Sequence, residues 1–404
     1  ASLQYAIHKD ESHRVSSRAR THVLQPLAVE GLPSKAMALH GALVGFDIKE
    51  RTIMTIHRLK LSLASASILI LASLAGTPAL SQSDLPDGVS ALLDAAEAEG
   101  TVSIFVSSDA RTAEDEARLE DGILNDLGIG IDIRLVSGAP DPVYIQQLVQ
   151  QHNAVVEVPV DLFVTVPTLL GILNDAGAIA ATDWVALDAK HDEIAQQVHG
   201  LFVAEFARPI FYNTDLLDPD DVPTSLDELL SEEWTGKIVT AALPDVFSPW
   251  AMGLGQEATL DMVETLFSDL RVGIAPAPTA IRTLVESGEY PIGFGIRISA
   301  DQVANNSPVA YVPIKAPLVP RFAGVLEHSN HKNAATVVAW WLSQTEGGQA
   351  LSAEVLDWPR HTMPGTDLYE MSVLTDGVYS APAGWWMNEG VEAGNAIARL
   401  LQDL

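Results

Sequence analysis

Short apolar runs alternate with longer amphipathic stretches between residues 101 and 165. The short runs are rich in β-branched residues and predict buried strands, whereas the longer stretches place apolar residues three and four positions apart, which predicts helices. Because strand and helix alternate, we expect a mainly parallel sheet with helices on both faces. The predicted strands lie at residues 101–106, 129–136 and 160–165, and the predicted helices at residues 113–127 and 142–152.

Polar residues with small side chains follow the first and third of these strands. Ser107 and Ser108 come directly after the first strand, and Thr165 closes the third. Sheets of this kind bind ligands beyond the carboxyl ends of their strands. We therefore expect these three hydroxyl groups to act as neutral hydrogen-bond donors to a ligand.

Residues 208–239 predict a crossing from a first lobe to a second. A β-prone run ends at Tyr212, and the acidic, proline-containing stretch 218–223 predicts an exposed turn. Thr224 or Ser225 can then accept a backbone N–H bond as the N-cap of a helix. The elements expected after this crossing are strands at 237–241, 290–298 and 309–314, a loop at 244–250, helices at 259–270 and 280–286, a return at 317–321, helical structure at 333–354 and a terminal helix at 393–404.

A secretory signal peptide is expected at residues 54–81. A basic head is followed by an apolar stretch at 61–76, and small residues stand at Ala79 and Ser81. The alternative is a membrane anchor, but a spanning helix needs about 20 apolar residues. Residues 1–53 are then expected to be an upstream or non-native extension. The chain contains no Cys for lipid attachment, so we expect a mature protein free in the periplasm.

The chain of 404 residues is 48% hydrophobic, enough for a large core, and it is strongly acidic. The first 60 residues carry nine of the 23 Lys and Arg and five of the 53 Asp and Glu, so the rest holds 14 basic and 48 acidic residues. So acidic a surface repels nucleic acid, and no nucleic-acid partner is expected. The absence of Cys excludes disulfides, thiolate catalysis and Cys-based zinc sites.

Catalytic signatures are missing from the sequence. There is no Gly-x-Ser-x-Gly elbow, no His-Glu-x-x-His and no phosphate-binding Gly-rich loop. His328, His331 and His361 could supply imidazole ligands to a metal, but no carboxylate nearby in the sequence completes a site. We expect a binding protein that is not an enzyme and has no cofactor or structural metal.

Three motifs identify a family resemblance. They are the run from Tyr212 to Leu216 (Tyr-Asn-Thr-Asp-Leu), the segment from Pro223 to Ile238, and a downstream pair, His-Lys-Asn-Ala-Ala from His331 and Glu-Gly-Gly-Gln from Glu346. Residues 101–364 resemble type II periplasmic solute-binding proteins, in particular the subgroup that includes ferric-iron-binding proteins.

This resemblance implies two doubly wound α/β lobes with a ligand cleft between them and closure by hinge rotation. It also implies a monomer that hands its ligand to the permease of an ABC importer. A secreted hydrolase and a ligand-presenting subunit of a membrane sensor remain alternatives. The expected division is lobe 1 at 82–207 and 321–363, lobe 2 at 208–320, and a tail at 364–404 that packs on the lobes.

Ferric-binding members of the family hold iron with two adjacent tyrosines in the second lobe. This chain has no Tyr-Tyr, and residues 293–302 read Gly-Phe-Gly-Ile-Arg-Ile-Ser-Ala-Asp-Gln where the pair is expected. We therefore expect an organic ligand, with ferric iron as an alternative.

Arg297 and Arg321 are the expected anchors of an organic anion. A guanidinium offers a planar fork to a carboxylate or phosphonate, although in so acidic a chain each arginine can equally pair with a local acid. Trp250 and Tyr212 are expected to contact an apolar part of the ligand, unless Trp250 is simply buried. Ser248 is a further donor. The alternative ligand is an organic cation such as thiamine or a polyamine, caged by Trp250 and by Asp245 or Asp301.

Overall fold

The computed structural model describes residues 85–106, 111–139, 141–297, 307–375 and 377–404. All of them belong to the second of two compact units of the chain, residues 72–404. The expected extension, the expected signal peptide and the hydroxyl groups of Ser107 and Ser108 lie outside the described residues.

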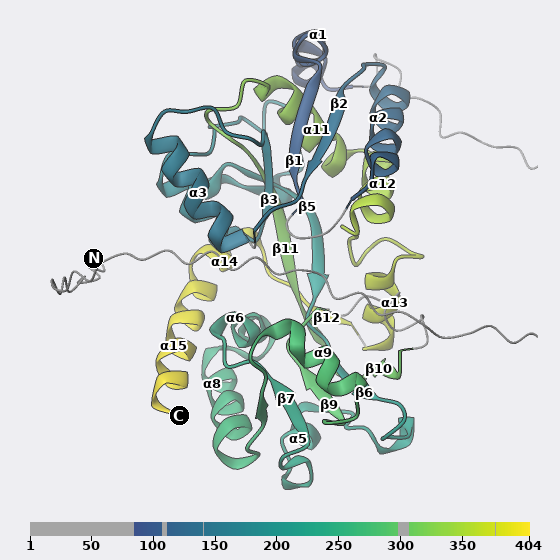
Figure 1. Cartoon of the computed structure of the whole chain (residues 1–404), viewed down its shortest axis with the longest axis vertical. Helices are drawn as coiled ribbons and strands as arrows, with labels where there is room; N and C mark the ends of the chain where they lie inside the picture. Colours follow the sequence, from purple (N-terminus) through teal and green to yellow (C-terminus); the bar gives the residue numbers. More distant parts are fainter. Residues whose placement is uncertain (1–84, 107–110, 140, 298–306, 376) are drawn as a thin grey trace, which may run out of the picture. The chain divides into compact units, whose positions relative to one another are not determined.

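The first sheet has the strand order β2-β1-β3-β11-β5-β4, and β12 pairs with β11 (Figure 1). The three strands expected from the alternating pattern are present and parallel, so this prediction is confirmed. β11 runs antiparallel to β3 and β5. The bounds are β1 (Thr101–Phe105), β2 (Asp132–Val136), β3 (Leu162–Thr165), β4 (Ile194–Ala195), β5 (Gly200–Ala207), β11 (Ala316–Val325) and β12 (Val378–Tyr379).

Helices cover both faces of this sheet. On one face, the buried side chains of Val102 and Ile104 pack with residues of α1 and α11. On the other face, Phe105 stacks on Tyr144 of α3 with ring centroids 4.2 Å apart. The bounds are α1 (Asp87–Glu99), α2 (Ala113–Leu127), α3 (Asp141–Asn153), α4 (Pro167–Asp175), α11 (Lys332–Gln344), α12 (Glu346–Leu356) and α13 (Asp367–Leu374).

A second sheet has the order β10-β6-β9-β7-β8 and its own apolar core. The helix expected after Thr224 is the short α5, and Ser225 caps it by accepting a hydrogen bond from the Glu228 backbone N–H at 3.2 Å. The two sheets give the two α/β lobes that were expected. The strands are β6 (Ile210–Asn213), β7 (Ile238–Thr240), β8 (Gly273–Ile274), β9 (Ile292–Phe294) and β10 (Val309–Tyr311), and the helices include α5 (Leu226–Leu229), α6 (Pro244–Phe247), α7 (Ala251–Leu254), α8 (Gln256–Glu264) and α9 (Pro278–Glu286).

The chain passes from the first sheet to the second through Arg208 and Pro209, which join β5 to β6. It returns between β10 and β11, before residue 316 and therefore earlier than the expected return at 317–321. Arg321 consequently lies within the first sheet, where it pairs with Ala204 of β5.

The stretch 244–250 is helical rather than a loop. Pro244 occupies the first turn of α6, where its missing N–H costs nothing, and the 3-10 helix η6 (Ser248–Trp250) follows directly. Val246, Phe247 and Trp250 are buried in the core of the second sheet. Burial of this apolar face stabilises helical turns where a loop was expected.

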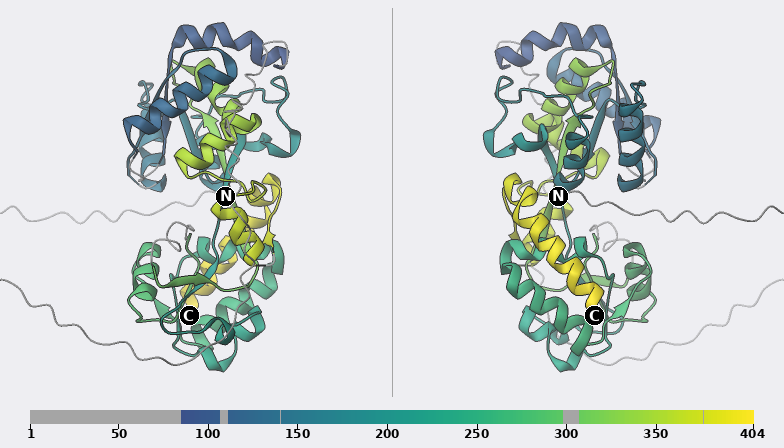
Figure 2. Two further views of the ribbon diagram at one scale, coloured as in Figure 1. Left: turned by 90° about the vertical axis from the view of Figure 1, so that its right-hand side faces the viewer. Right: turned by 90° about the vertical axis from the view of Figure 1, so that its left-hand side faces the viewer.

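The tail contacts both groups of elements. The helix α14 (Ala383–Met387) packs against α4, and α15 (Glu389–Asp403) packs along α6 and α8 (Figure 2). The expected terminal helix thus begins at Glu389, four residues before its expected start. Among the described helices, none combines the length and the apolar character that crossing a membrane requires.

Glu99, the last residue of α1, caps the N-terminus of α11. Its carboxylate accepts hydrogen bonds from Asn333 Nδ2 and from the Ala334 backbone N–H, both at 2.7 Å. The residue at the N-cap of α11, His331, supplies no side-chain cap. A negative charge at this position also interacts favourably with the positive end of the helix dipole.

We expect Glu99→Ala to lower the free energy of unfolding by about 1–3 kcal/mol, because it removes hydrogen bonds to a charged acceptor. Urea unfolding followed by circular dichroism measures the change. Asp94→Ala, on an exposed position of the same helix, is the matched control and should change stability by less than about 0.5 kcal/mol. Equal losses in the two variants would contradict the capping role.

Candidate ligand site

Two arginines, one directly after β5 and one on β11, lie beside an aromatic ring of β5. The guanidinium carbon of Arg208 is 5.8 Å from the centroid of the Phe206 ring, and that of Arg321 is 5.4 Å from it. Side chains two positions apart on a strand share a face, which places Phe206 and Arg208 together where the chain leaves the first sheet. Cation–π contacts of this kind attract guanidinium groups to the ring by about 0.5–1 kcal/mol at exposed sites.

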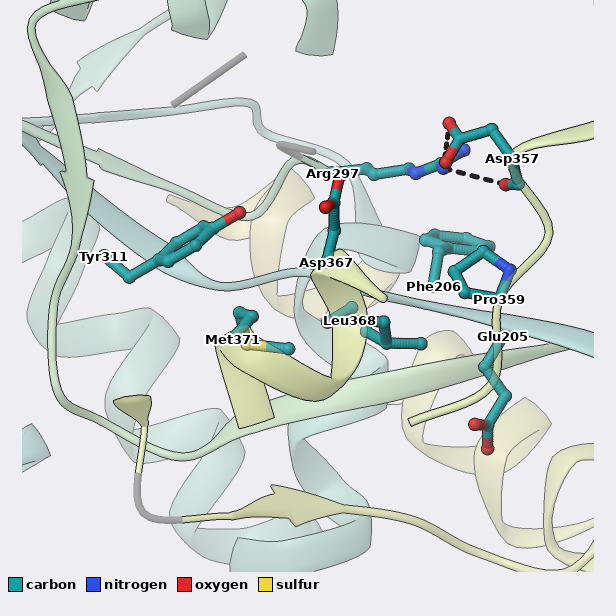
Figure 3. A pocket seen from close by; sticks show the side chains of 10 residues that line it. Glu205, Phe206, Arg297, Tyr311, Asp357, Pro359, Asp367, Leu368 and Met371 are labelled. Carbon is teal, nitrogen blue, oxygen red and sulfur yellow. Dashed lines mark hydrogen bonds and ion pairs between the residues drawn. The ribbon is translucent and has the colours of Figure 1, made fainter. Parts of the chain in front are cut away.

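A pocket adjoins this cluster on the Phe206 side (Figure 3). Arg297 and Tyr311 reach it from the second sheet, while the α12–α13 connection and α13 supply acids and apolar side chains. Its free space is about 20 Å³, room for about one water molecule. An organic ligand therefore needs side chains here to move. The lining residues are Glu205, Phe206, Ala207, Arg297, Tyr311, Asp357, Pro359, Asp367, Leu368 and Met371.

Arg297 binds the carboxyl end of α12. Its Nη2 atom donates to the Asp357 backbone carbonyl at 3.0 Å and forms an ion pair with the Asp357 carboxylate. Arg111 Nη2 donates to the neighbouring Leu356 carbonyl at 2.7 Å. Helix carboxyl ends carry unsatisfied carbonyls and partial negative charge, so two guanidiniums stabilise this end of α12.

Asp357 adopts a left-handed backbone conformation, with φ of 53°, as the C-cap of α12. Aspartate tolerates this conformation better than most residues, but glycine is the usual choice. The aspartate at this position directs a carboxylate to Arg297, which a glycine cannot do.

Arg208 pairs with Asp245 in the first turn of α6. Its Nη2 atom lies 3.0 Å from Asp245 Oδ2, and its Nη1 atom donates to the Asp245 carbonyl. The Arg208 side chain is 16% exposed and that of Asp245 is 65% exposed. The pair between Arg297 and Asp357 shows the same asymmetry, with 26% and 47%.

Other predicted ligand contacts lie inside the protein. Thr165 is buried and donates to Asp141 Oδ2 at 2.8 Å, and Tyr212 is buried in β6. Trp250 is fully buried, and its ring stacks on Phe294 with centroids 5.1 Å apart. Trp250 thus has the packing role that was the alternative to ligand contact.

Ser248 and the histidines occupy separate places. Ser248 is half-buried in η6, next to Gly394 of α15. His328 stacks on His152 with ring centroids 4.6 Å apart, His331 Nδ1 lies 3.1 Å from Asp161 Oδ1, and His361 Nδ1 lies 2.7 Å from Glu205 Oε2. The three histidines do not converge, and the described part of the chain brings together no group of three or more His, Asp or Glu that fits a metal.

Sequence reasoning did not single out Arg111, Phe206, Arg208 or Asp357. Arg208 stands two residues after Phe206 at the predicted crossing, and this spacing was the available signal. Asp357 had no local signal, because its role depends on a partner 60 residues away in the chain.

Comparison with known proteins finds one family and many similar folds. Residues 172–369, just under half of the chain, match the family model of bacterial extracellular solute-binding proteins. A search of curated protein sequences finds no match.

Solved structures of solute-binding proteins share the fold. Iron-bound HitA from Pseudomonas aeruginosa has a TM-score of 0.54 and 18% identity, covering 74% of this chain and 99% of that protein. FutA (IdiA) of Trichodesmium, in complex with iron and citrate, has a TM-score of 0.57 and 16% identity with the same coverage. The spermidine/putrescine substrate-binding protein PotD of Streptococcus pneumoniae has a TM-score of 0.52 and 12% identity, again covering 74% and 99%. Identities this low establish the fold, and they leave the ligand open.

Tyr311 provides a test of the pocket. Burial is the largest cause that raises the pKa of its phenol, Asp367 raises it further, and Arg297 opposes the shift. An unfolded phenol loses its proton near pH 10, so above that pH the unfolded state releases a proton that the folded state keeps. The stabilisation that the Tyr311 phenol contributes is therefore fully present below pH 10, and it is lost as the pH rises towards the pKa of the folded state.

We expect the free energy of unfolding to fall less steeply between pH 10 and 11 in Tyr311→Phe than in the wild type. The slope difference should approach about 1.4 kcal/mol per pH unit, the limit for one proton. Urea unfolding at closely spaced pH values measures it. The comparison uses slopes, because the substitution itself also shifts the baseline. Parallel curves for the two proteins would show that Tyr311 is not held in a desolvated site.

Proposed function

We propose, from the premise that this chain is a bacterial extracellular solute-binding protein with the type II periplasmic fold, that it delivers a small organic anion to an ABC importer. The mature protein is proposed to act as a periplasmic monomer after removal of residues 54–81, with its ligand between the lobe built on the first sheet and the lobe built on the second. Its direct partner would be the membrane permease.

The asymmetry of the two ion pairs carries the proposal for the ligand. In each pair the arginine is the more buried partner and the acid the more exposed one. An exposed carboxylate gains at most about 1 kcal/mol from such a pair and regains full hydration when it leaves. A partly buried guanidinium left without an anion loses more, because its own hydration is incomplete.

A carboxylate or phosphonate ligand can therefore exchange with Asp245 or Asp357 at small cost. Each acid moves into water, and the ligand takes over its place on the arginine. The planar fork of Arg208 or Arg297 then binds the new anion through charge-assisted hydrogen bonds. Arg321 adds a third positive charge beside Phe206, which raises the local preference for an anion.

Phe206 is the proposed contact for the apolar part of the ligand. It lines the pocket that Arg297 enters, whereas Trp250 and Tyr212 are buried in the apolar core of the second sheet. The hydroxyl groups of Ser107, Ser108 and Ser248 stay in the proposal as neutral donors to the ligand, and Thr165, whose hydroxyl donates to Asp141, would act through that carboxylate.

Other ligands and roles remain candidates for the same test. Similar folds carry iron, citrate or polyamine names, so likeness does not choose among them. An organic cation would need Asp245, which pairs with Arg208, or Asp301. Genes for a permease and an ATPase beside this one support import, a neighbouring histidine kinase supports sensing, and turnover of an ester, amide or phosphoester would support a hydrolase.

Calorimetric titration tests the arginine anchors with the anion that mass spectrometry identifies in protein purified under native conditions. We expect Arg208→Ala or Arg297→Ala to weaken binding by about 10- to 100-fold, since each loses charge-assisted hydrogen bonds of about 1.5–3 kcal/mol. Arg134→Ala, an exposed arginine on β2 paired with Asp132, is the matched control and should leave affinity unchanged.

Replacement of the two acids should change the ligand affinity in the opposite direction. Asp245→Asn and Asp357→Asn remove the carboxylates that compete with the ligand, so affinity should rise by several-fold in each variant. Weaker binding in both asparagine variants would contradict exchange of the acids. Unchanged binding in both arginine-to-alanine variants would rule out the anion hypothesis, and a thermal shift produced by ferric iron alone would favour the metal.

A further inference from the structure

A second pocket lies beside β5 and β11, on the face of these strands opposite Phe206 and Arg321. Figure 3 shows the carboxylate of Glu205 pointing away from Arg297 and the other labelled side chains. It points instead toward a pocket with about 340 Å³ of free space, within the usual size range of small-molecule sites. The lining residues are Asp192, Glu193, Phe202, Glu205, Leu318, Pro320, Phe322, Arg360, His361, Thr362, Ser380, Ala381, Pro382 and Ala383.

One part of the wall of this pocket is apolar. Phe202 and Phe322 meet edge to face with ring centroids 5.8 Å apart, and Leu318 and Pro320 of β11 continue the surface. The tail segment 380–383, which leads into α14, covers one side. Such walls fit an aliphatic or aryl group.

The cationic side chain at the pocket is already occupied. Arg360 is buried, and its guanidinium donates to Glu193 Oε1 at 2.8 Å, to the Ser343 carbonyl at 2.8 Å and to the carbonyls of Phe202 and Val203. All three of its nitrogen atoms are engaged. Arg360 therefore organises the wall, and its charge is already balanced by Glu193.

The acceptors at the pocket are only partly used. Glu205 has a side chain that is 9% exposed. Its Oε2 atom accepts from the His361 backbone N–H at 3.0 Å and lies 2.7 Å from His361 Nδ1. Within the described ranges, Glu205 Oε1 and the exposed carboxylate of Asp192 have no hydrogen-bond donor. Two carboxylate acceptors, together with the hydroxyl groups of Thr362 and Ser380, thus lie beside the apolar part of the wall.

We propose that this pocket is a second binding site, for an organic ammonium with an apolar body. The ammonium group donates to Glu205 Oε1 and is attracted by Asp192, and the apolar body lies against Phe322, Leu318 and Pro320. The site is separate from the arginine cluster on the other face of β5 and β11. It would let a cationic molecule bind against β5 and β11 of the first sheet.

Proton release accompanies binding at this site. The hydrogen bond to Glu205 raises the pKa of His361, and burial opposes the shift. The charged groups around His361 are Glu205 on β5, Asp192 and Glu193 on the 3-10 helix η2 (His191–Glu193), and Arg360 beside it. An ammonium at Glu205 competes electrostatically with the imidazolium, so His361 gives up its proton and affinity rises with pH through the His361 pKa.

Calorimetry with benzylammonium as the probe tests the proposal. We expect measurable binding at pH 8, weaker binding at pH 6, and a heat that depends on the ionisation enthalpy of the buffer. Glu205→Gln should lower affinity at least tenfold. Benzyl alcohol and benzoate, which share the ring without the positive charge, should not bind at this site.

Ala381→Trp, which fills the pocket from the tail, covers the case in which Glu205→Gln fails to fold; it should abolish binding and keep the circular dichroism spectrum of the wild type. Asp94→Asn, on the exposed face of α1, is the charge-matched control. No binding of benzylammonium to the wild type at 10 mM, or equal binding in wild type and Ala381→Trp, would overturn the site. Saturating benzylammonium should leave the organic-anion site available, so this test and that of the proposed function fail independently.

Discussion

The carboxyl end of α12 is the point on which the candidate ligand site depends. Its last carbonyls accept hydrogen bonds from Arg111, which stands before α2 in the first sheet's connections, and from Arg297, which follows β9 of the second sheet. A helix end has several unsatisfied carbonyls and a partial negative charge. One helix terminus thereby fixes arginines that are distant in the sequence.

Two arginines near the crossing are paired with acids that are more exposed than the arginines themselves. In a chain with a net charge of −30, acidic residues far outnumber basic ones. Asp245 and Asp357 neutralise two of its few arginines. Because these acids are well hydrated, the arginines keep their positions without being committed to a buried pair. Buried pairs are costly to open, whereas a surface acid can leave and return. Ligand exchange is therefore compatible with a stable fold.

The opposite face of the same strands is organised differently. There Arg360 is buried and all of its nitrogens are engaged, so it serves the architecture. Glu205, adjacent in sequence to Phe206, directs its charge to this face because side chains alternate along a strand. The paired strands β5 and β11 thus have Arg321 beside Phe206 on one face and the Glu205 carboxylate on the other.

Local chemistry in the sequence predicted much of the fold. The alternating apolar runs predicted β1, β2 and β3, and Ser225 capped the helix as expected, because both depend on neighbouring residues. The site was harder to predict. Trp250 was expected at the ligand, but its burial depends on packing against Phe294, 44 positions along the chain. Arg297 was identified, yet its partner Asp357 is defined by a left-handed helix cap that residue spacing cannot reveal.

The account depends on exchange between a ligand anion and the acids that hold the arginines. A crystal structure of the chain with its co-purifying organic anion tests this most directly. We expect acidic oxygens of the ligand within about 3 Å of the guanidinium of Arg208 or Arg297, with Asp245 or Asp357 turned into solvent. A ligand bound elsewhere, with both ion pairs intact, would contradict it.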